Sequence, residues 1–247
     1  MPIPPNDFEM KKIKLQAPGV YVFADFCPGV IAGFSGRQFE RVRFGRFLEK
    51  LGADERRFVS VKQEHTTEIL IAEEPVAEER IVADGIITNR AGLACGVRTA
   101  DCVPIFYFDP REKVAGIAHA GWRGIRDGIC GKMVERMKET FGTQPANVRV
   151  AIGPAIRDCC YEVGEEFREY FPEQYRIRKT GPSAGKGFVD LAAAAAGDLI
   201  RAGVGEPHIR DCGICTSCRH DLFFSARRGD GKERILSVIQ MAAETRN

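Results

Sequence analysis

Residues 99–124 have the sequence TADCVPIFYFDPREKVAGIAHAGWRG, and this stretch decides which fold the chain is expected to adopt. Two apolar runs, at 103–108 and 114–118, flank turn-forming residues, which predicts a β-hairpin. Cys102 comes directly before the first strand and His119 directly after the second. A hairpin loop of four residues would place Cys102 opposite His119 on one face, whereas a loop of five would turn the two side chains to opposite faces.

A third polar segment joins this pair. Gln63 and His65 follow a predicted strand at 58–61, so a second imidazole lies at another strand end. The chain has only four histidines, which narrows the chemistry. Two imidazoles and one thiolate suit a zinc ion with one open coordination position, or a Cys–His nucleophilic pair. Taken alone, Cys102 is more often a small buried hydrophobe and His119 a structural histidine, but their pairing in the hairpin favours a functional site.

The residues beside this pair suit a site for charged ligands. The carboxylate of Asp101 needs solvent or a partner, which argues against simple burial of its segment. Arg123 supplies a planar cation suited to phosphate or carboxylate, and Gly121 allows close approach of the backbone. We therefore predict that Cys102, His119, Asp101 and Arg123 carry the catalysis.

The composition limits the class of protein. A chain of 247 residues with 44% hydrophobic and 28% charged residues is typical of a globular protein with a substantial core. The net charge of +2 is too small to predict binding to nucleic acid or to a membrane surface. No stretch approaches the roughly 18 apolar residues of a membrane span. The nine cysteines are odd in number and not spaced like a secreted disulfide framework, so we expect a reduced, cytoplasmic protein.

Periodicity along the chain predicts interleaved strands and helices. The predicted helices span 39–51, 125–141, 161–171 and 189–202. Further strands are predicted at 20–23, 29–34, 58–61, 68–72, 81–88, 93–97, 148–152, 209–211, 222–225 and 235–239. Because strict β-α-β alternation is absent, we expect a single α+β domain over 1–247, with mixed β-sheets packed against outer helices.

A second group of cysteines lies near the C-terminus. Cys212, Cys215 and Cys218, with His220, have a spacing that could hold a second zinc or an iron–sulfur cluster. The fourth cysteine that such clusters need is missing from this segment, so partly buried free thiols are the expectation. The adjacent pair Cys159-Cys160 is not expected to form a strained disulfide in a reducing compartment.

Motifs spread over about residues 30–240 resemble the YfiH-like, laccase-domain family, also named polyphenol oxidase. These motifs are Gln63-x-His65, Ala83-Asp84-Gly85, Thr99-Ala100-Asp101-Cys102, His119-Ala120-Gly121-Trp122-Arg123-Gly124, Ile152-Gly153-Pro154, Cys160-Tyr161-Glu162-Val163 and Phe223-Phe224-Ser225-x-Arg227-Arg228. The resemblance implies a YfiH-like fold, similar to the catalytic domain of cytotoxic necrotizing factor toxins. Two segments depart from the family pattern, at 33–36 and at Gly231-Lys232-Glu233-Arg234.

The resemblance also implies an activity. It makes His65, Cys102 and His119 the ligands of a zinc ion. It implies phosphorolysis of purine nucleosides (adenosine, inosine and methylthioadenosine), with phosphate as co-substrate and an accompanying adenosine deamination. The residues predicted to bind substrate are Gln63, Arg98, Gly121 and Arg227. Asp101 and Glu64 are candidates for protonating the leaving purine.

Three alternatives remain open. A metal-free Cys–His hydrolase or deamidase would use Cys102 as nucleophile and His119 as base. A copper-dependent polyphenol oxidase needs about ten histidines for its copper sites, and this chain has four, so copper would be adventitious occupancy of the zinc site in vitro. The third alternative is a non-catalytic metal-binding protein. The oligomeric state does not follow from the sequence.

Overall fold

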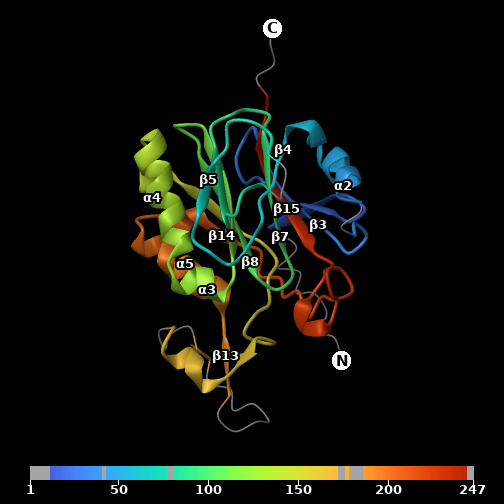
Figure 1. Ribbon diagram of the computed structural model, residues 1–247, viewed down its shortest axis with the longest axis vertical. Coiled ribbons are helices and arrows are strands. Elements are labelled where there is room, and N and C mark those ends of the chain that lie inside the picture. The colour runs from blue at the N-terminus through green and yellow to red at the C-terminus, as the bar shows by residue number, and fades with distance from the viewer. Residues whose placement is uncertain (1–11, 41–42, 77–79, 172–175, 178–185, 244–247) are drawn as a thin grey trace.

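Two six-stranded β-sheets form the centre of the molecule (Figure 1). The computed structural model describes residues 12–40, 43–76, 80–171, 176–177 and 186–243. The first sheet has the order β1-β2-β3-β15-β7-β4, and the second has the order β14-β10-β8-β9-β6-β5. A small sheet of order β11-β13-β12 lies at one end of the molecule.

Both large sheets are mixed. In the first sheet only β4 and β7 pair in parallel, whereas in the second sheet β5 pairs with β6 and β10 with β14 in parallel. The strands of the first sheet are β1 (Ile13–Ala17), β2 (Val20–Phe23), β3 (Val30–Ser35), β4 (Phe58–Val59), β7 (Ala94–Thr99) and β15 (Ile235–Met241). Those of the second sheet are β5 (Ile69–Ile71), β6 (Gly85–Thr88), β8 (Val103–Asp109), β9 (Val114–Ala120), β10 (Arg149–Ile152) and β14 (Ile209–Asp211). The small sheet contains β11 (Glu162–Val163), β12 (Arg176–Ile177) and β13 (Gly187–Val189).

The main core lies between the two large sheets. Phe23 on β2 and Phe106 on β8 contact each other edge to face, with ring centroids 5.4 Å apart. Phe34 and Phe223 pack in the same cluster. Because the inner and outer faces of β8 are both buried, its sequence is a continuous apolar run rather than an alternating one.

Helices cover the two outer faces. Helix α2 (Phe44–Leu51) packs on the first sheet, while α3 (Trp122–Arg126), α4 (Ile129–Phe141) and α5 (Leu191–Arg201) pack on the second, on the opposite side of the molecule (Figure 1). The predicted class, one α+β domain with mixed sheets and outer helices, is therefore confirmed.

The hairpin of β8 and β9 forms as predicted, but its turn is displaced by one residue. Residues 110–113 form the loop, and His119 pairs with Pro104 rather than with Cys102. The reason is Asp109, whose carboxylate accepts hydrogen bonds from the backbone N–H of Arg111 (2.9 Å) and of Glu112 (3.4 Å). This Asx turn extends β8 through Asp109. The prediction of direct opposition is wrong, yet a shift of two in the pairing keeps Cys102 and His119 on one face.

Three predicted helices differ in the structure, and the one predicted over 39–51 begins only at Phe44. The helix predicted over 125–141 is broken into α3 and α4, because Gly128 has a φ of +85°, a left-handed conformation that ends a helix. The helix predicted over 161–171 is absent. In its place β11 pairs with β13, and only Glu165–Arg168 form a 3₁₀ turn.

The ends of the chain also depart from the predictions. The strand predicted over 222–225 does not form; the segment follows a turn in which Phe223 N–H donates to Arg219 O. Strand β1 was not predicted.

Helix α5 begins after Asp190, whose carboxylate accepts hydrogen bonds from the N–H groups of Ala192 and Ala193. Within the described residues, no helix combines the length and the apolar character that crossing a bilayer requires.

Candidate metal centre

His65, Cys102 and His119 meet at one edge of the two-sheet core. Their ligand atoms all lie within 4.8 Å of one another. Cys102 Sγ is 3.8 Å from His65 Nε2, and the two imidazole rings lie edge to face with centroids 4.8 Å apart. The structure therefore brings together all three of the predicted metal ligands.

Each ligand comes from a different segment, and two of the three segments are held by unusual backbone angles. His65 follows β4 and has a φ of +59°. Cys102 follows Asp101, which has a φ of +85°. Such angles are uncommon in residues other than glycine, and they persist only where the surrounding structure enforces them. His119 is buried within β9.

Asp84 contacts the ring of His119 and the backbone of His65. Its carboxylate is fully buried and lies 2.6 Å from His119 Nδ1, so that His119 Nε2 is left to face a metal. The same carboxylate accepts hydrogen bonds from the N–H groups of His65 (3.2 Å) and Thr66 (2.7 Å) and from the Thr66 hydroxyl (2.9 Å). A carboxylate bonded to a ligating histidine is the usual support of a metal site. Sequence reasoning noted Asp84 only as part of a motif, since nothing in its spacing reveals the partner.

Gly121 lets the backbone pack closely against two of the candidate ligands. A Cβ atom on this residue would lie 2.6 Å from His65 Cδ2 and 3.2 Å from Cys102 Sγ. Gly121 has a φ of −75°, which any residue can adopt, so the reason for glycine is space and not backbone conformation. The donor set and the Asp84 support together fit a metal ion with an open coordination position.

Cys102 and His119 also perturb each other's ionisation. Burial favours the neutral thiol of Cys102, but the charge of His119 and hydrogen bonds to His119 and His65 outweigh it, and lower the pKa from 9.0 to about 6. Burial likewise opposes the imidazolium of His119, yet Cys102 and Asp84 raise its pKa from 6.5 to about 9. Without a metal, the pair is therefore a thiolate and an imidazolium at neutral pH.

This ionisation can be measured in metal-stripped protein by alkylation with iodoacetamide. The thiolate is the reactive form, so labelling of Cys102 should rise with a midpoint near pH 6 and stay level above it. Burial raises the pKa of Cys27, which serves as the internal control and should still gain reactivity above pH 9. Peptide mass spectrometry resolves the two sites, and equal midpoints would contradict the ion pair.

A cavity of about 420 Å³ opens above the three ligands. That volume suits a small-molecule ligand. Its wall carries the cationic side chains of Lys62, Arg98, Lys232 and Arg234. The segment of Lys232 and Arg234, which departs from the family pattern, is thus part of the cavity wall.

Gln63 holds two parts of the cavity wall together. Its side-chain amide donates to the carbonyl oxygen of Arg98 and accepts from the N–H of Arg98, both at 2.8 Å. The guanidinium of Arg98 lies over the ring of Phe44, 5.9 Å from its centroid. Gln63 and Arg98, which the sequence predicts to bind substrate, both line the cavity.

Asp101 points away from the cavity. Its carboxylate accepts hydrogen bonds from the hydroxyl groups of Thr216 (2.6 Å) and Ser225 (3.1 Å) and from the N–H of Arg227 (2.7 Å). These contacts fix the strained backbone that precedes Cys102. The placement favours a positioning role for Asp101 over the predicted catalytic one.

The two remaining predicted residues lie beside the cavity rather than in its wall. Arg123 is exposed and lies over the ring of Trp122, 4.4 Å from its centroid. The guanidinium of Arg227 donates to Glu162 O at 3.2 Å and lies 5.3 Å from the centroid of Tyr161. Burial and the nearby charge of Cys102 raise the pKa of Tyr161 to about 12. Tyr161 is therefore a further polar group near the site that was not singled out as a site residue.

Known proteins share much of this sequence. A family model described as multi-copper polyphenol oxidoreductase laccase matches residues 40–242. A purine nucleoside phosphorylase YlmD of Geobacillus stearothermophilus is 40% identical over 63% of this chain, and the match spans 59% of that relative. A purine nucleoside phosphorylase of Bacteroides thetaiotaomicron is 33% identical, over 84% of this chain and 83% of the relative. An adenosine deaminase RL5 from an unknown prokaryotic organism is 34% identical, over 72% of each chain.

Solved structures show the same fold. The hypothetical protein YfiH of Bacillus licheniformis superposes with a TM-score of 0.85 and 27% identity, over 93% of this chain and 98% of the other. YlmD of Geobacillus stearothermophilus gives a TM-score of 0.83 and 28% identity, over 94% and 99%. The predicted resemblance to YfiH-like proteins is confirmed.

Proposed function

The chain belongs to the family described as multi-copper polyphenol oxidoreductase laccase and is an enzyme, and from this premise we propose that it is a zinc-dependent purine nucleoside phosphorylase that also deaminates adenosine. The proposed substrates are adenosine, inosine and methylthioadenosine, with phosphate as the second substrate. Relatives named purine nucleoside phosphorylase and adenosine deaminase support this activity.

The observation that carries the proposal is the position of His65, Cys102 and His119 at the base of a cavity with a cationic wall. These three residues would hold the zinc ion, which would supply Lewis-acid polarisation of a substrate oxygen. Zinc is favoured because two imidazoles and a thiolate with an open position suit a catalytic zinc site, and because four histidines are too few for the several copper sites of a multicopper oxidase.

The cationic wall gives the phosphate a place to bind. Lys62, Arg98, Lys232 and Arg234 would bind and orient phosphate by charge-assisted hydrogen bonds. In phosphorolysis a phosphate oxygen bonds to the ribose C1′ while the bond from C1′ to the purine nitrogen breaks, and a proton passes to the purine. The carboxylate of Asp101 is fully engaged, whereas that of Glu64 is half exposed and paired with Lys62 at 2.5 Å.

A direct test is the release of adenine or hypoxanthine by purified enzyme with and without phosphate. We expect the release to depend on phosphate and to yield ribose 1-phosphate in equal amount. Equal rates without phosphate would contradict phosphorolysis. Ammonia release from adenosine, measured separately, tests the deaminase activity.

Lys232 offers a test of the phosphate-binding wall. Replacing it by glutamine should raise the KM for phosphate about tenfold with little change in kcat, since a hydrogen bond to a charged group contributes about 1.5 kcal/mol. Lys50→Gln, an exposed lysine in α2, is the matched control. A fall in kcat at unchanged KM would place Lys232 outside the phosphate site.

One observation favours a second candidate function. The thiolate and imidazolium of Cys102 and His119 are the reactive pair of a metal-free Cys–His hydrolase. Stoichiometric alkylation of Cys102 in zinc-replete enzyme would support the hydrolase, because a ligated thiolate is shielded.

The nine free thiols of the chain favour a reducing compartment such as the cytoplasm.

A further inference from the structure

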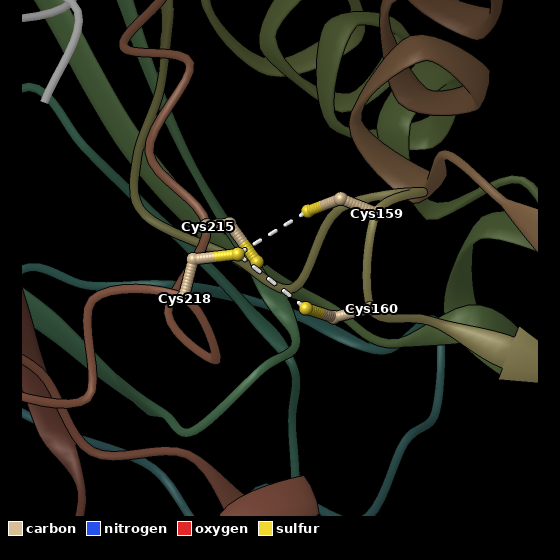
Figure 2. A group of neighbouring side chains, drawn as sticks. All are labelled: Cys159, Cys160, Cys215 and Cys218. Atoms are coloured by element: carbon tan, nitrogen blue, oxygen red, sulfur yellow. Dashed lines mark hydrogen bonds between the residues drawn. The ribbon is translucent and has the colours of Figure 1, made fainter. Parts of the chain in front are cut away.

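Four cysteine side chains converge outside the cavity described above. Cys159, Cys160, Cys215 and Cys218 place their sulfur atoms within 4.8 Å of one another. Figure 2 shows the four thiols directed toward a common centre, two from each of two chain segments. Cys212, which the spacing had grouped with Cys215 and Cys218, is buried outside this cluster.

Backbone pairing brings the two segments together. Ala155 and Cys215 form a parallel bridge just beyond the paired strands β10 and β14. Ala155 N–H donates to Ile214 O at 3.2 Å, and Thr216 N–H donates to Ala155 O at 3.0 Å. The adjacent pair Cys159-Cys160 thereby supplies the cysteines that the C-terminal segment lacks.

The spacing of the sulfur atoms fits a tetrahedral metal site. Cys218 Sγ is 3.5 Å from Cys159 Sγ and 3.4 Å from Cys160 Sγ. In a tetrahedral zinc site with Zn–S bonds of about 2.3 Å, neighbouring sulfur atoms are about 3.8 Å apart. A disulfide requires about 2.05 Å. The cysteine sulfur atoms that ligate a four-iron cluster lie farther apart than the sulfur atoms of this group, which are all within 4.8 Å of one another.

The surroundings also suit a bound thiolate. The Cys215-x-x-Cys218 spacing is the usual ligand pair of structural zinc sites. Arg228 donates to Ser217 O at 3.1 Å and adds a positive charge beside this loop.

We propose that Cys159, Cys160, Cys215 and Cys218 bind a second zinc ion in a closed, structural site. Each thiol loses its proton on binding, and the metal is held by four protein ligands with no open position. The site joins the segment of Tyr161 to the segment of Thr216 and Arg227. Because Thr216 and the N–H of Arg227 both hold Asp101, next to Cys102, the second ion stiffens one side of the active site.

Metal content of the purified holoenzyme tests the proposal. We expect two zinc equivalents per chain in the natural sequence, one in Cys215→Ser/Cys218→Ser, and one in His65→Ala/His119→Ala. Cys27→Ser, a half-buried thiol outside both groups, should keep two. The two double variants thus separate this site from the proposed catalytic centre. Failure of the catalytic proposal would leave the cysteine-bound zinc in place.

A second measurement does not depend on altered cysteines folding correctly. X-ray absorption at the zinc edge of His65→Ala/His119→Ala should show four sulfur neighbours at about 2.3 Å. Three results would each overturn the proposal: a single zinc in the natural sequence that the His65→Ala/His119→Ala variant loses, iron in place of zinc, or disulfides among the four cysteines in freshly purified, metal-free protein.

Discussion

Cys102→Ala is expected to lower kcat/KM for phosphorolysis by about 10³-fold and to remove one zinc equivalent per chain. The variant leaves His65 and His119 as the only protein ligands, and two imidazoles hold zinc weakly compared with a set that includes a thiolate. Loss of a polarising metal removes several kcal/mol of transition-state stabilisation, and about 4 kcal/mol corresponds to that factor. The measurements are steady-state phosphorolysis and zinc content on the same preparation.

The matched control for this result is Cys27→Ala, which removes a thiol that contacts neither metal-ligand group. It should keep both the activity and the zinc. Full phosphorolysis by Cys102→Ala would contradict both the proposed zinc chemistry and a cysteine nucleophile at this site.

Asp84→Asn is expected to have the largest effect on stability. The carboxylate accepts hydrogen bonds from Thr66 and from the backbone of His65, and it lies against His119 Nδ1. An amide of the same shape can accept at only one end, so buried donors lose their partners. We expect a loss of about 3 kcal/mol in the free energy of unfolding and a 10–100-fold weaker affinity for zinc.

The contribution of Asp84 to the free energy of unfolding should decrease in acid. Burial alone would raise the pKa of Asp84, but the hydrogen bond and charge of His119 and the contacts of Thr66 outweigh it and hold the pKa below 3.8. The stabilising contribution is therefore complete above pH 3.8 and is lost as the pH falls through the lower folded value. In denaturant titrations of metal-stripped protein, the free energies of unfolding of the natural sequence and of Asp84→Asn should become equal in strong acid.

Asp109→Asn is the control for Asp84→Asn. Asp109 is also fully buried, and its carboxylate caps the hairpin turn at the far end of β8. The control should reduce stability without changing the affinity for zinc. Equal losses of zinc affinity in both variants would assign the effect of Asp84 to general destabilisation.

The sequence predicted the fold where long apolar runs carried a clear period. The hairpin of β8 and β9 and the central strand β15 formed within a residue or two of the predicted limits. The helix predicted over 161–171 failed because pairing of β11 with β13 overrides local propensity. The turn at Asp109 shifted because one side chain bonded the backbone, an effect that periodicity does not contain.

The candidate site could also be predicted only in part. His65, Cys102 and His119 were predictable because each lies at a strand end and matches a family motif. Asp84 and the four-cysteine group were not, because their contacts join segments that are distant in the sequence. Cys160 and Cys218, for example, are 58 positions apart and meet only through tertiary structure.

The histidine content bears on the oxidase label of the family. The chain has four histidines, of which His65 and His119 lie in the candidate centre. His208 instead lies 2.6 Å from the guanidinium of Arg149, and His220 is exposed. Two imidazoles and one thiolate cannot supply the ligands of a trinuclear copper cluster together with a separate copper site.

The position of β15 in the first sheet bears on how the protein emerges during synthesis. This strand pairs with β3 on one side and β7 on the other, so it joins two parts of the sheet made much earlier. Until the ribosome has released residue 241, β3 and β7 each present an open edge, a template for mispairing with other chains. Lys232 and Arg234 immediately precede β15, so the basic wall of the cavity is among the last parts of the domain to assemble. Nascent chains stalled before this strand should consequently depend on chaperones.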